Sequence, residues 1–169
     1  MPPTRAEVEA LKAKVEAAFA DVPRPAAGGL VRCDCWECAG LAKSFDGLGW
    51  RDVGAELLER NHDQLPLFSP AAFRHFLPAY LLHSLAHFEN AGVCEYTLYA
   101  LTPGKETEGE AEHFRERFEP FTPEQMEAVY DFLGLAARDE RFAFHHTALG
   151  RGRRRLEKYS GHAARAGGD

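Results

Sequence analysis

The chain has 169 residues, of which 45% are hydrophobic and 27% charged. This composition is typical of a globular protein, and the length suffices for one domain with its own core. No apolar run approaches the roughly 18 residues that a membrane-spanning helix needs. The net charge of −6 is uneven, because residues 151–169 carry +4 and residues 1–150 carry −10. An acidic body of this kind disfavours broad contact with nucleic-acid phosphates.

The first half of the chain is predicted to be helical. A capping-box sequence at residues 4–7 begins a helix that runs to about Ala20, where two prolines follow. From Cys35 the apolar spacing is again helical, as far as the glycines at 47 and 49. A third helix is expected to carry an apolar stripe from Trp50 to Leu58.

Two later helices have clear starts. Ser69-Pro70 and Thr122-Pro123 each place an N-cap residue before a proline at the first helical position. The helix from Pro70 is expected to run to about Glu89, with a kink or a split at Pro78.

The remaining segments are less regular. Residues 93–101 suit either a short strand or a short helix, and the helix is favoured, whereas residues 103–112 are expected to form an acidic loop. A last helix is predicted from about His145 to Tyr159. The sequence therefore predicts an all-α fold of six or seven helices, with one domain over residues 1–150 and a basic, frayed tail over residues 151–169.

Three of the four cysteines lie within six residues, at Cys33, Cys35 and Cys38, where the chain enters a helix. Thiolates are soft ligands, and C-x-x-C at a helix entry lets two sulfur atoms converge on one ion. The helix N-terminus also lowers thiol pKa values, which favours both metal binding and nucleophilic reactivity. The pattern predicts a zinc-binding knuckle, with Cys94 as the natural fourth ligand and His62, His83 or His87 as alternatives.

Other interpretations of these cysteines stay open. Cys35 and Cys38 alone match a redox-active pair with Cys33 as a resolving thiol, although the β-α-β context of such sites is absent. An iron–sulfur cluster is a further possibility, with Cys94 as its fourth ligand. Finally, Cys35 and Cys38 share a helix face with Phe45 and so also suit an inward, packing role.

Several other residues are better explained by structure than by chemistry. His83 and His87 have the i, i+4 spacing of metal ligands, but both fall away from the apolar stripe and are expected at the boundary or the surface. The histidines at 145 and 146 are expected to be surface residues. Trp36 and Trp50 are expected to be packing residues. No nucleotide-binding glycine motif and no complete nucleophile–base set is present, so the sequence favours a non-enzyme.

Two stretches carry a resemblance to a known family. The first is Cys35-Trp36-Glu37-Cys38 with Phe45-Asp46-Gly47 and Trp50, and the second is the segment from Ser69 to Leu81, after which residues 121–125 fit a third motif. Together they resemble a family of small bacterial proteins classed as a domain of unknown function, over roughly residues 30–136. The resemblance implies no activity, but it favours Cys35, Glu37 and Cys38 as the meaningful set.

These observations predict a bacterial protein of the reducing cytoplasm that binds zinc and acts through another protein, as an immunity or accessory factor. One alternative is a thiol- or metal-dependent enzyme that uses Cys35 and Cys38. A second alternative is a nucleic-acid-associated protein that uses the basic run Arg151–Arg155, although the overall charge makes nucleic acid an unfavourable partner.

Overall fold

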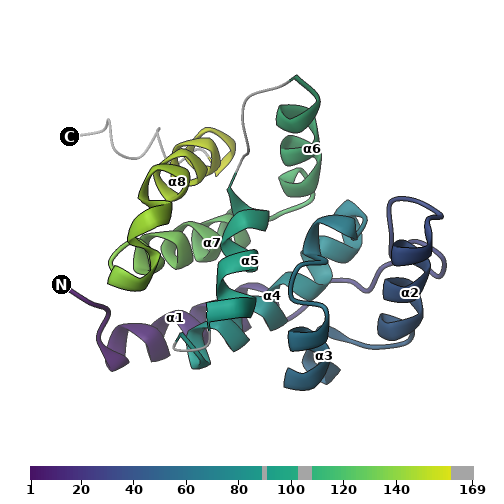
Figure 1. The fold of residues 1–169 in the computed structure, drawn as a ribbon, viewed down its shortest axis with the longest axis horizontal. Coiled ribbons are helices and arrows are strands. Elements are labelled where there is room, and N and C mark those ends of the chain that lie inside the picture. Colours follow the sequence, from purple (N-terminus) through teal and green to yellow (C-terminus); the bar gives the residue numbers. More distant parts are fainter. Residues whose placement is uncertain (89–90, 103–107, 161–169) are drawn as a thin grey trace. The chain divides into compact units, whose positions relative to one another are not determined.

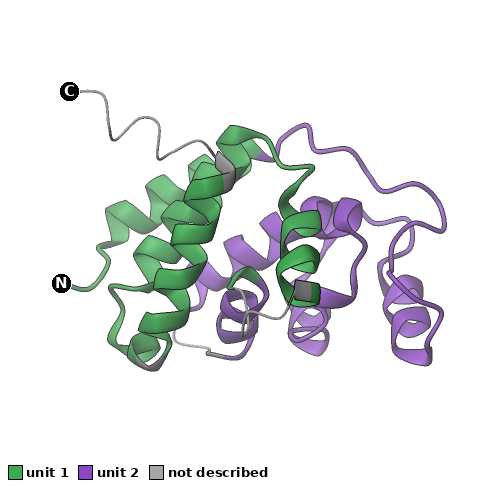
Figure 2. Cartoon of the chain, turned by 90° about the horizontal axis from the view of Figure 1, so that it is seen from above, with its two compact units in different colours: residues 1–18, 101–169 green, residues 19–100 purple. Residues whose placement is uncertain are grey.

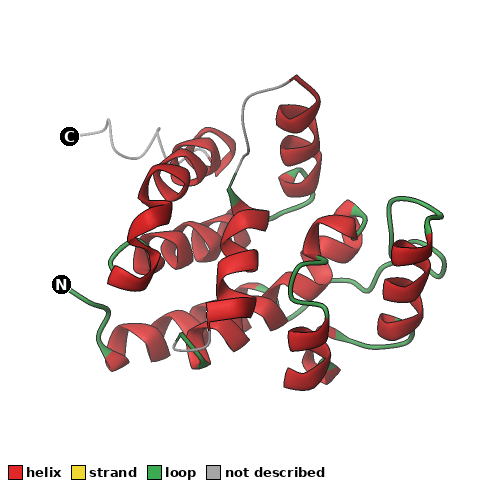
Figure 3. Cartoon of the chain, in the orientation of Figure 1, coloured by secondary structure: helices red, strands yellow, loops and turns green. Residues whose placement is uncertain are grey.

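The protein is helical throughout the part of the chain that the computed structural model describes, which is residues 1–88, 91–102 and 108–160. Figure 3 shows these residues as helices joined by loops, without a sheet. The eight α-helices of Figure 1 are α1 (Arg5–Ala18), α2 (Trp36–Phe45), α3 (Ala55–Arg60), α4 (Pro70–Ala86), α5 (Ala91–Leu101), α6 (Glu108–Phe118), α7 (Pro123–Ala136) and α8 (His146–Ser160). Three short 3-10 turns accompany them: η1 (Trp50–Asp52), η2 (Leu65–Leu67) and η3 (Glu140–His145).

The all-α prediction is confirmed, and the number of helices is larger than predicted. Helix α6 begins at Glu108, so the prediction of an acidic loop is wrong for residues 108–112, whereas residues 103–107 lie outside the described residues. Alanine and glutamate are good helix formers, and this intrinsic preference outweighs the acidic composition. Residues 93–101 form the favoured helix rather than a strand. The stripe that begins at Trp50 is divided between η1 and α3, with Gly54 as the N-cap of α3.

Helix α4 runs through Pro78 as one element instead of splitting there. Twelve of its seventeen residues are buried, including Pro78 itself. Burial of this extent supplies more stabilisation than the loss of one backbone hydrogen bond removes. Ser69 caps the helix as predicted, because its hydroxyl oxygen accepts a hydrogen bond of 3.2 Å from the Ala72 amide.

The chain divides into two compact units, shown in different colours in Figure 2. Unit 1 comprises residues 1–18 and 101–169, and unit 2 comprises residues 19–100. In unit 1, α7 packs against both α1 and α8. In unit 2, α4 packs against η1, α3 and η2. The single domain predicted over residues 1–150 stays a prediction.

Helix α8 extends to Ser160, into the segment predicted to be a basic tail. Helix α8 confirms the last predicted helix and includes the basic run Arg151–Arg155, whereas residues 161–169 lie outside the described residues. Leu149 and Leu156 are fully buried on one side of α8. Arg151, Arg154 and Lys158 are exposed. None of the helices in the described ranges is long and apolar enough to cross a bilayer.

Candidate metal centre

The thiols of Cys33, Cys35 and Cys38 form a cluster at the start of α2. Their Sγ atoms all lie within 4.8 Å of one another. The Sγ atom of Cys33 is 3.0 Å from that of Cys35 and 3.0 Å from that of Cys38. All three cysteines are free thiols, and Cys33 and Cys35 are exposed while Cys38 is buried. The structure thus brings together three of the four predicted ligands.

A short backbone anchor holds the chain just before Cys33. Val31 forms an isolated antiparallel bridge with Phe68. The Arg32 amide donates to the Leu67 carbonyl at 3.1 Å, and the Ser69 amide donates to the Leu30 carbonyl at 2.9 Å. These hydrogen bonds fasten the cysteine segment to the residues that begin α4.

The entry into α2 then fixes the positions of the other two thiols. Cys35 is the N-cap residue, with the extended dihedral angles φ −69° and ψ 163° that such positions adopt. Its carbonyl accepts the first helical hydrogen bond, from Ala39, at 2.9 Å. Cys38 follows one turn later on the buried face of the helix. The turn from extended to helical backbone therefore brings the thiols of Cys35 and Cys38 together.

Aromatic packing forms the base of the site. Phe45, at the end of α2, is fully buried and meets Phe68 and Phe76 edge-to-face, with ring centres 5.1 Å and 5.0 Å apart. Phe68 is also the bridge partner of Val31, so the same residue supports both the backbone anchor and α2. Cys38 is also a buried residue of α2, whereas Cys33 and Cys35 are exposed.

The three thiols differ in acidity. The hydrogen bond with Cys33, together with the backbone amides of Cys38 and Glu37, lowers the pKa of the Cys35 thiol. The hydrogen bond with Cys33 and burial raise the pKa of the Cys38 thiol to about 11. Cys35 is therefore the first of these two thiols to become a thiolate.

The donor set suits a thiophilic ion. A tetrahedral zinc site with Zn–S bonds of about 2.3 Å has sulfur atoms about 3.8 Å apart. The 3.0 Å separations here would increase by about 0.8 Å to reach that geometry. Movements of this size are small for Cys33 and Cys35, because both side chains are exposed. The three residues therefore fit a metal centre with one coordination position facing solvent.

The predicted fourth ligands lie elsewhere in the structure. Cys94 is buried in α5 and is not part of the cluster. The His62 ring contacts Tyr96, with ring centres 4.8 Å apart. His83 and His87 contact each other, with ring centres 4.7 Å apart. Among the described residues, the group placed to hold a metal ion contains the three cysteines alone.

Three predictions about side-chain placement need correction. Cys35 is exposed rather than inward, because as an N-cap it precedes the helical spiral that orients Cys38 and Phe45. Trp36 is 83% exposed instead of packed. His83 is buried rather than at the boundary or the surface, since α4 is covered on most of its faces. The predictions for Trp50, which is buried, and for His87, which is exposed, are confirmed.

His75 is a structural residue that the sequence analysis does not single out. Its Nε2 atom accepts a hydrogen bond of 3.1 Å from the Trp50 amide, and its Nδ1 atom lies 3.0 Å from the Pro23 carbonyl. This pairing requires the neutral ring with the proton on Nδ1. Burial lowers the pKa of His75, which favours that neutral form. No spacing rule could identify it, because its two partners are 25 and 52 residues away.

The fold and the site define a helical protein with a cluster of three thiols, two of them exposed, at a helix N-terminus. The chain belongs to a family of unknown function, DUF6714, whose family model matches residues 7–162. This match confirms the resemblance to a domain of unknown function and extends it over both ends of the predicted region. Comparisons with curated proteins and with solved structures give no match.

Proposed function

We propose that this protein binds one zinc ion through Cys33, Cys35 and Cys38 and acts as a non-enzymatic accessory factor through contact with another protein. The observation that carries the proposal is the convergence of the three Sγ atoms within 4.8 Å of one another. Thiolate donors favour zinc among the common divalent ions that have no redox chemistry.

The surface beside the cluster supports a role in protein contact. Trp36 lies between Cys35 and Cys38 in sequence and is 83% exposed. An exposed indole is unusual on a free surface, and tryptophan is enriched among the residues that dominate protein interfaces. Because the cluster presents its open side to solvent, water or a donor from a partner would complete the coordination of the metal.

Metal analysis of the protein purified without a histidine tag tests this proposal. We expect about one equivalent of zinc per chain, and the loss of this zinc in Cys35→Ser. Cys94→Ser is the matched control, because it removes a cysteine outside the cluster and should keep the metal. Zinc below half an equivalent in the wild type, or zinc retained in Cys35→Ser, would remove the metal claim.

One observation favours a thiol- or metal-dependent enzyme as a second candidate function. Catalytic zinc sites use three protein ligands and keep the fourth position open, as this cluster does. No histidine, aspartate or glutamate belongs to the cluster within the described residues, so a general base would have to come from elsewhere. Alkylation of the metal-free protein by iodoacetamide near pH 6 is a test: labelling of Cys35 no faster than that of a free thiol contradicts a nucleophilic role.

A further inference from the structure

A second candidate site lies in unit 1, which contains none of the cluster cysteines. A cavity of about 580 Å³ is lined by residues of α1 and α7, the turn after α7, and α8. This volume is within the range of small-molecule sites, which combine an apolar lining with a few convergent polar groups. The apolar part of the lining is formed by Ala10, Leu11, Leu135 and Ala137.

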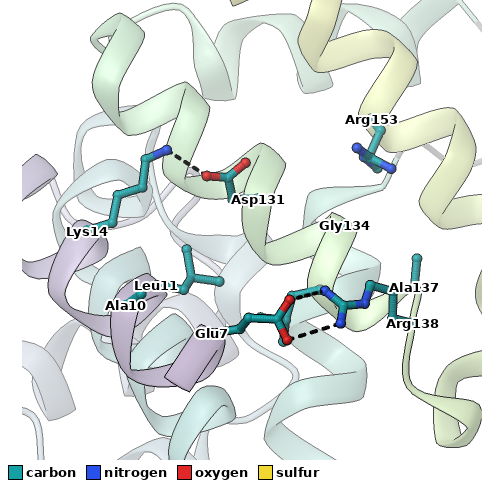
Figure 4. A pocket seen from close by; sticks show the side chains of 10 residues that line it. Glu7, Ala10, Leu11, Lys14, Asp131, Gly134, Ala137, Arg138 and Arg153 are labelled. Atoms are coloured by element: carbon teal, nitrogen blue, oxygen red, sulfur yellow. Dashed lines mark hydrogen bonds and ion pairs between the residues drawn. The ribbon is translucent and has the colours of Figure 1, made fainter. Parts of the chain in front are cut away.

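Two ion pairs at the cavity have their charges matched within the protein. Arg138 donates two hydrogen bonds to the Glu7 carboxylate, at 2.6 Å and 3.0 Å. Lys14 contacts Asp131 at 2.6 Å and Glu127 at 3.1 Å. Figure 4 shows both pairs as dashed lines, with the Lys14 pair and the Arg138 pair on opposite sides of Leu11. These cations are therefore already neutralised.

Arg153 is the third cation of the cavity, and it differs from Lys14 and Arg138 in its interactions. Its Cζ atom lies 4.3 Å from the centre of the Tyr130 ring, so the guanidinium group stacks on that ring. Its Nε atom is buried and has no hydrogen-bond partner. Among the residues that the structure describes, no carboxylate forms an ion pair with Arg153. A buried donor of this kind is costly unless a ligand or water satisfies it.

Gly134 of α7 lies beside the guanidinium group of Arg153. Arg153 extends from α8 toward Gly134 in Figure 4. A Cβ atom at this position would lie 3.4 Å from Cζ and 3.5 Å from an Nη atom of Arg153. These separations are ordinary van der Waals contact, so the guanidinium group lies directly against α7 at Gly134.

From this arrangement we propose that the cavity binds a small organic anion, with its acidic group on Arg153 and its apolar part on the Leu11 and Leu135 side. The planar guanidinium group matches a carboxylate or a phosphate group through paired hydrogen bonds. The two neighbouring ion pairs leave Arg153 as the cation available to such a ligand. The proposal is independent of zinc binding, because the cavity and the cysteines lie in different units.

The test is a titration of the wild-type protein followed by the NMR signal of the Arg153 Nε–Hε group. Benzoate and phenyl phosphate are the anionic probes, and benzyl alcohol is the neutral control with the same ring. We expect a saturable shift in the millimolar range with at least one anion. Saturation by benzoate alone would assign a carboxylate ligand, and saturation by phenyl phosphate alone would assign a phosphate ligand. Saturation by neither anion, or equal binding of benzyl alcohol, would overturn the proposal.

Matched variants localise the binding. Arg153→Gln should weaken binding about tenfold or more, as expected for the loss of a charge-assisted hydrogen bond. Arg154→Gln removes an exposed arginine of the same helix and should bind as the wild type does. If Arg153→Gln does not fold, Arg153→Lys replaces it, because lysine keeps the charge but lacks the planar group that forms paired hydrogen bonds with an acidic group, and it should also weaken binding. Wild-type affinity in a folded Arg153→Gln protein, or in Arg153→Lys where that variant replaces it, would contradict the proposal.

Discussion

The cysteine cluster and the charged cavity are built in opposite ways. The cluster takes its three donors from six consecutive positions, at one turn between extended chain and helix. The cavity takes its lining from residues between Glu7 and Arg153, on three separate helices and the turn after α7. The first site needs little beyond the turn itself and the backbone anchor before it. The second exists only when α1, α7 and α8 are packed together.

This difference has a physical consequence. Donors that are close in sequence are already near one another in the unfolded chain, so a metal can bind them with a small additional loss of chain entropy. The residues that line the cavity lie far apart in sequence, and they are brought together by burial of apolar surface between the helices. Perturbations of the core should therefore affect the cavity more than the cluster.

The largest effect is expected from Phe45→Ala, which tests how far the cluster is independent of the core. Phe45 is fully buried against Phe68 and Phe76, and its truncation should lower the free energy of unfolding by about 3–5 kcal/mol. Urea unfolding followed by circular dichroism gives this value. Zinc stoichiometry should stay near one equivalent in the folded variant. Loss of zinc without loss of the fold would show that the cluster depends on the core as strongly as the cavity does.

Zinc itself should stabilise the protein through the cysteine cluster. A ligand that binds only the folded state at a free concentration of about 1,000 times its Kd adds about 4 kcal/mol. Hydrogen exchange with zinc and with a chelator locates this effect, and the added protection should fall on α2 and the preceding bridge at Val31. Protection that is instead largest in α7 would show that zinc binds at another place.

A smaller effect is expected for the cap of α7, one of the three helices that line the cavity. The Thr122 hydroxyl accepts from the Gln125 amide at 3.3 Å, and the Gln125 side chain accepts from the Thr122 amide at 3.1 Å. Thr122→Ala should lower the free energy of unfolding by about 1 kcal/mol. Thr122→Ser keeps the hydroxyl group and should stay close to the wild type. A cost in Thr122→Ser as large as that in Thr122→Ala would contradict the capping explanation.

The smallest effect is a pH dependence at the Glu7–Arg138 pair. The hydrogen bonds from Arg138, followed by those from Thr4, lower the pKa of Glu7 from 4.5 to about 2. Because the folded-state pKa is depressed, the stabilisation is present above pH 4.5 and is lost as the pH falls toward 2. The Tm values of the wild type and Glu7→Gln should therefore differ at neutral pH and converge between pH 4.5 and 2. Glu16→Gln is the control, because Glu16 is exposed on the same helix. If the Tm values of the wild type and Glu7→Gln do not converge in this pH range, the contribution of the Glu7–Arg138 pair is contradicted.

The features that the sequence predicts correctly are those decided within a few residues. The capping box at Thr4 is present, with the Thr4 amide donating to Glu7 at 2.8 Å, and the caps at Ser69 and Thr122 are also confirmed. The convergence of Cys35 and Cys38 at the start of a helix is likewise determined within a few residues. Each of these features depends on backbone geometry that neighbouring residues determine.

The features that escape sequence reasoning depend on packing between distant segments. The exposure of Trp36 and the burial of His83 follow from which faces of α2 and α4 are covered, and helical spacing alone does not determine this. The stacking of Arg153 on Tyr130 joins α8 to α7, and no local sequence pattern indicates it. The cavity therefore cannot be predicted from the sequence, whereas the cysteine cluster can.

An anomalous difference map at the zinc edge, from crystals of the untagged protein, tests the central claim most directly. We predict one peak about 2.3 Å from the Sγ atoms of Cys33, Cys35 and Cys38. Crystals of Cys94→Ser should show the same peak, because the Cys94 thiol lies outside the cluster. A map without a peak at these three thiols, or a peak that Cys94 coordinates, would contradict the claim.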